Sequence, residues 1–120
     1  MISLGSQNKY YLYLPPTDMR KGFDGLCGLI LSASLGQVTD GHVYVFVNRR
    51  RDKIKLLIWD RNGLVLFYKR LEQGTIELPE VEHGQCKLHL SWQTLMFMLE
   101  GISLKNITRR KRFNPHLLRS

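Results

Sequence analysis

The feature that most constrains this fold is a stretch of three apolar runs joined by two short turns, between residues 41 and 70. In each run the side chains alternate between two faces, as they do in β-strands. The first run, for example, reads VYVFV. The pair Asn62-Gly63 lies between the second and third runs, and an Asn-Gly pair flanked by apolar runs is the strongest short-range hairpin signal. The stretch therefore predicts an antiparallel meander of three strands.

The segment before the meander predicts a strand followed by a helix. Residues 9–14 are rich in aromatic side chains and end at two prolines, as a short strand would. Thr17 and Asp18 are good N-caps, and apolar residues then recur at intervals of three and four toward a helix end near Gly36. Glycines at every third position of this helix predict close packing on the sheet, with approach of a ligand to bare backbone as the alternative. These glycines are Gly22, Gly25 and Gly28.

The segment after the meander predicts a weak strand at residues 75–78, an acidic loop and a strand at residues 87–90. Ser91 is a plausible N-cap for a second helix, and Gly101 closes it. We therefore predict a single α+β domain, residues 1–108, followed by a basic C-terminal arm, residues 109–120. Its antiparallel meander sheet has about five or six strands, with one helix near the N-terminus and one near the C-terminus.

The length and composition are those of one folded domain without a membrane segment. The chain has 120 residues, and no apolar run approaches the roughly 18 residues that a spanning helix requires. The N-terminus lacks the order of a signal peptide. Cys27 and Cys86 are too few for a disulfide framework, so reduced thiols are expected. A cytoplasmic protein with no membrane contact follows as the expectation.

The net charge of +8 is distributed unevenly along the chain. Residues 49–70 carry eight basic and two acidic side chains, residues 71–104 one basic and five acidic, and residues 105–120 six basic and no acidic ones. A polyanion such as nucleic acid would be attracted to the two basic regions. The acidic region between them would repel it or meet a basic protein partner.

The clustered cations are predicted to contact DNA phosphates, and nearby aromatic rings are candidates for base stacking or partner contact. The predicted DNA-binding residues of the meander are Arg49, Arg50, Arg51, Lys53, Lys55, Arg61, Lys69 and Arg70. The tail adds Arg109, Arg110, Lys111 and Arg112. The candidate rings are Tyr44, Trp59 and Tyr68, although aromatic residues at period two more often pack in a core.

Catalytic and metal-binding patterns are weak. The spacing of His83, Cys86 and His89 gathers three ligand types, but strand alternation puts His83 and Cys86 on opposite faces. The aspartates that a nuclease would need have better explanations as caps and turn residues. They are Asp18, Asp24, Asp40, Asp52 and Asp60. No Walker-type glycine loop is present. The expectation is a protein with no catalytic residue, no metal and no cofactor.

Three segments together resemble one family. The segments TDMRKGFDGL (residues 17–26), GHVYVFVNRRRDKIKLLIWDRNGLVLFYKRLEQG (residues 41–74) and LSWQTLMFMLEGISL (residues 90–104) are similar to the TnpB accessory proteins of the insertion sequence 66 family of bacterial mobile elements. These small proteins are distinct from the RNA-guided nuclease that shares their name. Arg20 and Lys21 lie within the first segment and join the candidates for DNA or transposase contact.

The resemblance implies a part in transposition beside a larger transposase, which carries the catalytic acidic residues, and beside the other proteins of the element. We therefore predict a non-catalytic accessory protein that binds DNA, with the element ends as the expected site. The alternative is a protein-interaction subunit that docks on the transposase through the acidic segment 72–82 and exposed apolar residues. A small metal-dependent nuclease is a third and weaker hypothesis. The oligomeric state is left open.

Overall fold

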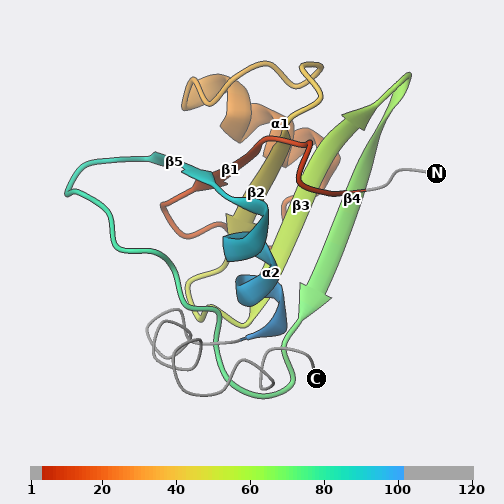
Figure 1. The fold of residues 1–120 in the computed structure, drawn as a ribbon. Helices are drawn as coiled ribbons and strands as arrows, with labels where there is room; N and C mark the ends of the chain where they lie inside the picture. Colours follow the sequence, from red (N-terminus) through yellow and green to blue (C-terminus); the bar gives the residue numbers. More distant parts are fainter. Residues whose placement is uncertain (1–3, 102–120) are drawn as a thin grey trace.

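The computed structural model describes residues 4–101, in which five strands form one sheet in the order β4-β3-β2-β1-β5 (Figure 1). The strands are β1 (Tyr10–Tyr13), β2 (Val43–Val47), β3 (Lys53–Asp60), β4 (Gly63–Arg70) and β5 (Lys87–Leu90). The helices are α1 (Phe23–Ser32) and α2 (Trp92–Glu100). The predicted α+β class, with one helix in each half of the chain, is confirmed. No helix in this part of the chain is long and apolar enough to cross a membrane.

The predicted meander is formed by β2, β3 and β4, which pair antiparallel. The turn between β3 and β4 lies one residue earlier than the Asn-Gly pattern suggests. Asp60 pairs with Gly63, so the two turn residues are Arg61 and Asn62. Arg61 has a φ of 59°, a backbone conformation that glycine and asparagine adopt more readily than arginine. Gly63 instead begins β4.

One strand pair runs against the antiparallel prediction. β1 lies parallel to β2, with Tyr10 opposite Val43. The chain leaves β1, forms α1 and returns to the same end of the sheet, and such a crossover joins parallel strands. β5 then pairs antiparallel with the other side of β1, so this short strand lies inside the sheet.

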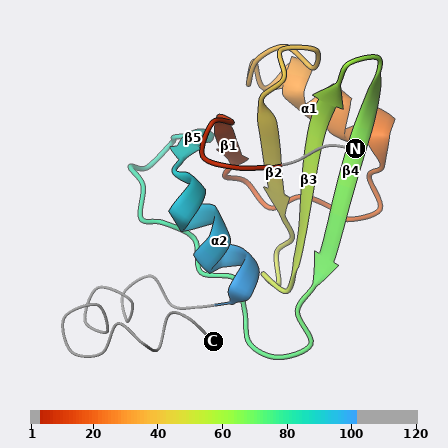
Figure 2. The same ribbon diagram turned by 45° about the vertical axis from the view of Figure 1, so that its right-hand side comes forward.

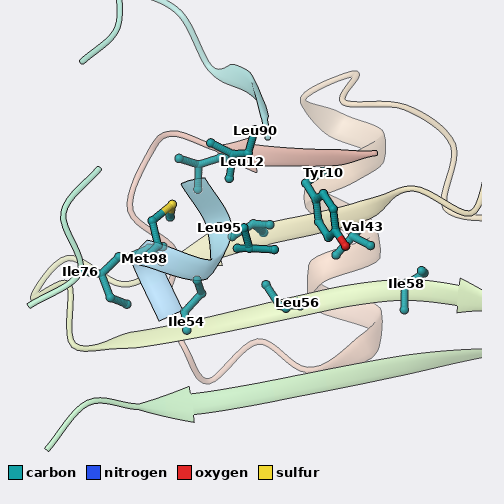
Figure 3. Close-up of a cluster of buried hydrophobic side chains, with 12 residues drawn as sticks. Tyr10, Leu12, Val43, Ile54, Leu56, Ile58, Ile76, Leu90, Leu95 and Met98 are labelled. Carbon is teal, nitrogen blue, oxygen red and sulfur yellow. The ribbon is translucent and has the colours of Figure 1, made fainter. Parts of the chain in front are cut away.

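The two helices cover opposite faces of the sheet (Figure 2), and all five residues of β2 are therefore buried. On the face of α2, Ile54 and Leu56 of β3 lie against Leu95 and Met98 (Figure 3). On the other face, the second core cluster joins Leu26 and Ile30 of α1 to side chains of β2 and β3. The alternation read from the sequence thus serves two cores, one for each helix.

The first helix begins later than predicted. α1 starts at Phe23, and its N-cap, Gly22, offers no side-chain hydrogen bond. The carboxylate of Asp18 instead accepts the backbone N–H of Arg20 at 2.9 Å, forming a turn before the helix. The prediction that these glycines pack closely on the sheet is also wrong, because a Cβ atom on Gly22 or Gly28 would meet nothing within 4 Å, and one on Gly25 would meet the side chain of Lys21.

The chain after β4 follows the prediction except at residues 75–78, and the strand predicted at residues 87–90 is β5. Residues 75–78 form no strand, although Ile76 is buried and its N–H donates to the carbonyl of Arg51 at 2.6 Å. Ser91 caps α2 as predicted, its Oγ accepting the N–H of Thr94 at 3.0 Å. Gly101 ends the helix in the left-handed conformation, with a φ of 70°.

Candidate nucleic-acid interface

A cleft with a volume of about 580 Å³ lies at the end of the sheet where β2 ends and β3 begins. One wall is the loop of residues 16–20, which precedes α1, and the other is the turn of residues 48–50. Lys53 and Tyr68 complete the lining. The cleft therefore joins two segments that are separated in the sequence by the whole of α1.

Backbone and side-chain hydrogen bonds hold both walls in place. The N–H of Thr17 donates to the carbonyl of Val47 at 2.9 Å, which ties the first wall to the end of β2. In the second wall, Oδ1 of Asn48 accepts the N–H groups of Asp52 and Lys53 at 3.1 and 3.0 Å. These bonds close the turn over three consecutive arginines and fix where their side chains begin. The short turn predicted between the first two strands of the meander is thus present, and Asn and Asp at the ends of NRRRD are residue types that favour turns.

Lys55 has a structural role in the cleft. Only 5% of this residue is exposed, and its Nζ donates to the carbonyl oxygens of Met19 at 2.7 Å and Lys21 at 2.8 Å. The same ammonium lies 4.5 Å from the ring centre of Tyr68. Burial lowers the pKa of Lys55, and the nearby carboxylate of Asp18 opposes this shift. The charge of Lys55 is therefore directed inward, and its predicted contact with phosphate stays a prediction.

Of the three aromatic candidates, Tyr68 alone lines the cleft. Tyr68 is 54% exposed, so its ring is accessible for stacking. Tyr44 is buried, and its hydroxyl donates to Oδ2 of Asp40 at 2.5 Å. Burial raises the pKa of Tyr44, and the hydrogen bond to Asp40 adds to the rise. Tyr44 is therefore a core residue, while Trp59 is half-buried near the far end of β3.

Arg49 and Arg50 give the cleft a positive charge that no side chain of the described residues neutralises by direct pairing. Both residues are exposed, and neither makes an ion pair within residues 4–101. Arg20, on the facing wall, is paired with Asp18 at 2.6 Å. This hydrogen-bonded pair lowers the pKa of Asp18 from 3.8 to about 2, so the carboxylate stays ionised near neutral pH.

Several predicted DNA-binding residues share this end of the sheet. Lys53 pairs with Arg70 in the strand register, so the end of β4 lies beside the turn (Figure 2). Arg70 forms an exposed ion pair with Glu72 at 2.8 Å, and Lys69 donates to the carbonyl of Leu99 at 2.7 Å. Arg51 and Lys21 are exposed near the cleft walls. The cations at this end of the sheet thus differ: Arg70 and Lys69 are already bonded within the protein, whereas Arg51 and Lys21 are exposed.

Of the other predicted residues that the structure describes, Arg61 lies away from the cleft. Arg61 lies at the opposite end of the meander, because β3 runs for eight residues between it and the cleft, a length of about 26 Å. The four basic residues of the tail lie outside the described residues; they are Arg109, Arg110, Lys111 and Arg112. Within residues 4–101 no three metal-ligating side chains gather at one point. His89, one of the residues considered for zinc, packs its ring 5.3 Å from that of Tyr11.

Comparison with known proteins identifies similar chains. The family model described as IS66 Orf2 like protein matches residues 8–109. Uncharacterized protein y4jC of Sinorhizobium fredii (strain NBRC 101917 / NGR234) is 33% identical over 95 residues, which cover 79% of this chain and 80% of that protein. Uncharacterized protein y4hO of the same strain is 29% identical over 106 residues, covering 88% and 90%. No solved structure matches this chain significantly.

Proposed function

The chain belongs to the family of IS66 Orf2-like proteins, which are accessory proteins of insertion sequences, and we propose that it serves DNA transposition as a non-catalytic DNA-binding factor. The cleft between the loop of residues 16–20 and the turn of residues 48–50 is the proposed contact surface. The observation that carries this proposal is the pair of exposed arginines, Arg49 and Arg50, on a turn that its own hydrogen bonds hold in shape.

Arginine at this position suits the phosphate backbone. Its guanidinium donates two parallel hydrogen bonds to phosphate oxygens and keeps its charge at all relevant pH values. Lys53 adds a point charge at the cleft, and the exposed ring of Tyr68 offers a face on which a base can stack. Contacts of this kind position DNA without reading its sequence. The cleft therefore supports a general affinity for DNA, and any preference for element ends requires further contacts.

The first test compares two double variants that remove the same charge from opposite ends of the sheet. The variant Arg49→Ala with Arg50→Ala removes the two exposed arginines that line the cleft. Lys9→Ala with Arg61→Ala removes two exposed cations near the other end, where β1 begins and β3 ends. Binding is measured by fluorescence anisotropy with element-end duplex, random duplex and single-stranded DNA, each at two salt concentrations.

The cleft variant should bind duplex DNA about tenfold more weakly at moderate salt. The slope of log K, the logarithm of the association constant, against the logarithm of the salt concentration should become shallower by about two. The distal variant should keep most of the salt dependence. Equal losses in both variants would show that net charge alone drives binding and would reject the cleft as the contact surface. If the affinity of the wild-type protein for DNA does not change with salt concentration, the proposed phosphate contacts are wrong.

The alternative function, docking on the transposase, is favoured by a different surface. Residues 80–86 are all exposed and include Glu80 and Glu82 with Val81 between them. An acidic loop with an apolar centre suits a basic patch on a protein partner. Copurification of the transposase in nuclease-treated, high-salt buffer, lost when Val81 and Glu82 are changed to Ser and Gln, would support this function. Copurification that nuclease treatment abolishes would assign the association to shared DNA.

A further inference from the structure

Within residues 4–101, the outer edge of β4 is the longest unpaired backbone in the sheet. β4 has eight residues, and its only strand partner in this range is β3. The N–H of Leu71, just after the strand, donates to the carbonyl of Asp52 at 2.7 Å, and antiparallel ladders alternate inward and outward residues. Odd-numbered residues of β4 therefore bond to β3. The residues whose N–H and C=O groups point away from the sheet are Leu64, Leu66, Tyr68 and Arg70.

Over residues 63–68 this edge lacks the features that usually prevent edge pairing. Phe67 is 40% exposed and Tyr68 is 54% exposed, and the three residues before them are only half-buried. Short length, inserted charges, proline and bulges protect natural edges. The other edge strand, β5, has four residues and carries Lys87 and His89. β4 is long, apolar over most of its length and uninterrupted, with its charges confined to one end.

We propose that β4 pairs with β4 of a second copy of this chain, in antiparallel orientation, to form one continuous sheet. The uncharged stretch of residues 63–68 is matched by the same stretch of a second copy, and the placement of charge sets the direction. A parallel pair would align Lys69 and Arg70 of both copies. An antiparallel pair sets these cations beside the uncharged start of the other β4, so like charges are kept apart.

The alternation of hydrogen bonds then limits the register. Outward residues must face outward residues, so the two-fold axis passes through Leu66 or Phe67 if the strands are to overlap fully. The register centred on Phe67 brings its exposed ring against the same ring of the second copy, at a non-hydrogen-bonded position where side chains approach most closely. It also sets Leu66 opposite Tyr68. We commit to this register because it places the exposed ring of Phe67 on the two-fold axis, where the second copy covers it.

The oligomeric state of the full chain is the first test, by sedimentation velocity over a range of concentrations. The wild-type mass should approach twice the 14.0 kDa of one chain, and Phe67→Lys should shift it toward a single chain by placing two ammonium groups together. Val81→Lys is the matched control, since Val81 is equally exposed at 40% and lies away from β4. It should leave the dimer intact. A wild-type chain that stays monomeric at its highest soluble concentration would overturn the proposal, as would a dimer that Phe67→Lys leaves unchanged.

Cross-linking tests the register in a background with Cys27→Ser and Cys86→Ser. Phe67→Cys places two thiols across the axis, where Cα atoms about 4.5 Å apart can form a disulfide. Val65→Cys lies on the same face, but its two copies would be about 13 Å apart along the strands, too far to bridge. Mild oxidation should therefore link Phe67→Cys and not Val65→Cys. Equal linking of both variants would overturn the register, and circular dichroism checks that each variant is folded.

Discussion

Replacing Lys55 with methionine tests whether this buried ammonium holds the cleft together. Methionine keeps most of the length and flexibility of the side chain and removes its charge. The change leaves the carbonyl groups of Met19 and Lys21 without the hydrogen bonds that they now accept at 2.7 and 2.8 Å. It also removes the contact between the ammonium and the ring of Tyr68. The loop that forms one wall of the cleft would lose these two hydrogen bonds to the sheet and keep the one from Thr17 to Val47.

The expected cost follows from these contacts. Hydrogen bonds from a charged donor contribute about 1.5 kcal/mol each, and the contact with the ring adds about 0.5 kcal/mol. Methionine recovers part of this sum, because an apolar side chain avoids the cost of removing an ammonium from water. A net loss of about 2 kcal/mol in the free energy of unfolding is expected. For a domain of this size that corresponds to a fall of about 8 °C in Tm.

Urea unfolding followed by tryptophan fluorescence measures this loss, and Lys53→Met serves as the matched control. Lys53 is half-buried two positions away on the same strand, and its ammonium makes no hydrogen bond within residues 4–101. The control should change stability by less than about 0.5 kcal/mol. If both variants lose the same stability, or if Lys55→Met is as stable as the wild type, the structural role assigned to Lys55 is wrong.

Two further predictions concern the segment before and within α1. Gly28→Ala should raise the free energy of unfolding by about 1 kcal/mol, because the glycine lies in a helix with open space where a Cβ would go; a destabilised variant in thermal unfolding would mean that something packs there. Asp18 has its pKa lowered to about 2 by Arg20, so its contribution to stability is present above pH 3.8 and disappears as the pH falls toward 2. The difference in Tm between wild type and Asp18→Asn should therefore vanish over that interval, and a difference independent of pH would exclude the ion pair as its source.

Much of the fold could be predicted from local patterns. The alternation in residues 43–70, the turn beginning at Asn48 and the cap at Ser91 all depend on neighbours in the sequence, and each is present in the structure. The start of α1 could not be placed in the same way. Asp18 can cap a helix or close a turn, and in the structure its carboxylate closes a turn by accepting the backbone N–H of Arg20 and pairing with its guanidinium.

The sequence predicted that the candidate site is rich in basic residues, but it did not predict which of them line the site. Charge counting found the arginines of the turn, but it could not separate Arg50, which is exposed, from Lys55, which is buried. That distinction depends on where the loop of residues 16–20 crosses the sheet. Likewise, the distance between Arg61 and the cleft follows only from the length and direction of β3.

The sequence by itself determined the meander, the two helices and the family, because period-two alternation, caps and family motifs are properties of nearby residues. The tertiary structure alone decided that β1 runs parallel to β2 and that one edge of β4 has no strand partner among residues 4–101. It also decided which cations face solvent. These outcomes depend on packing between segments far apart in the chain, where the burial of a side chain and the pairing of a strand are set by partners that no local pattern names.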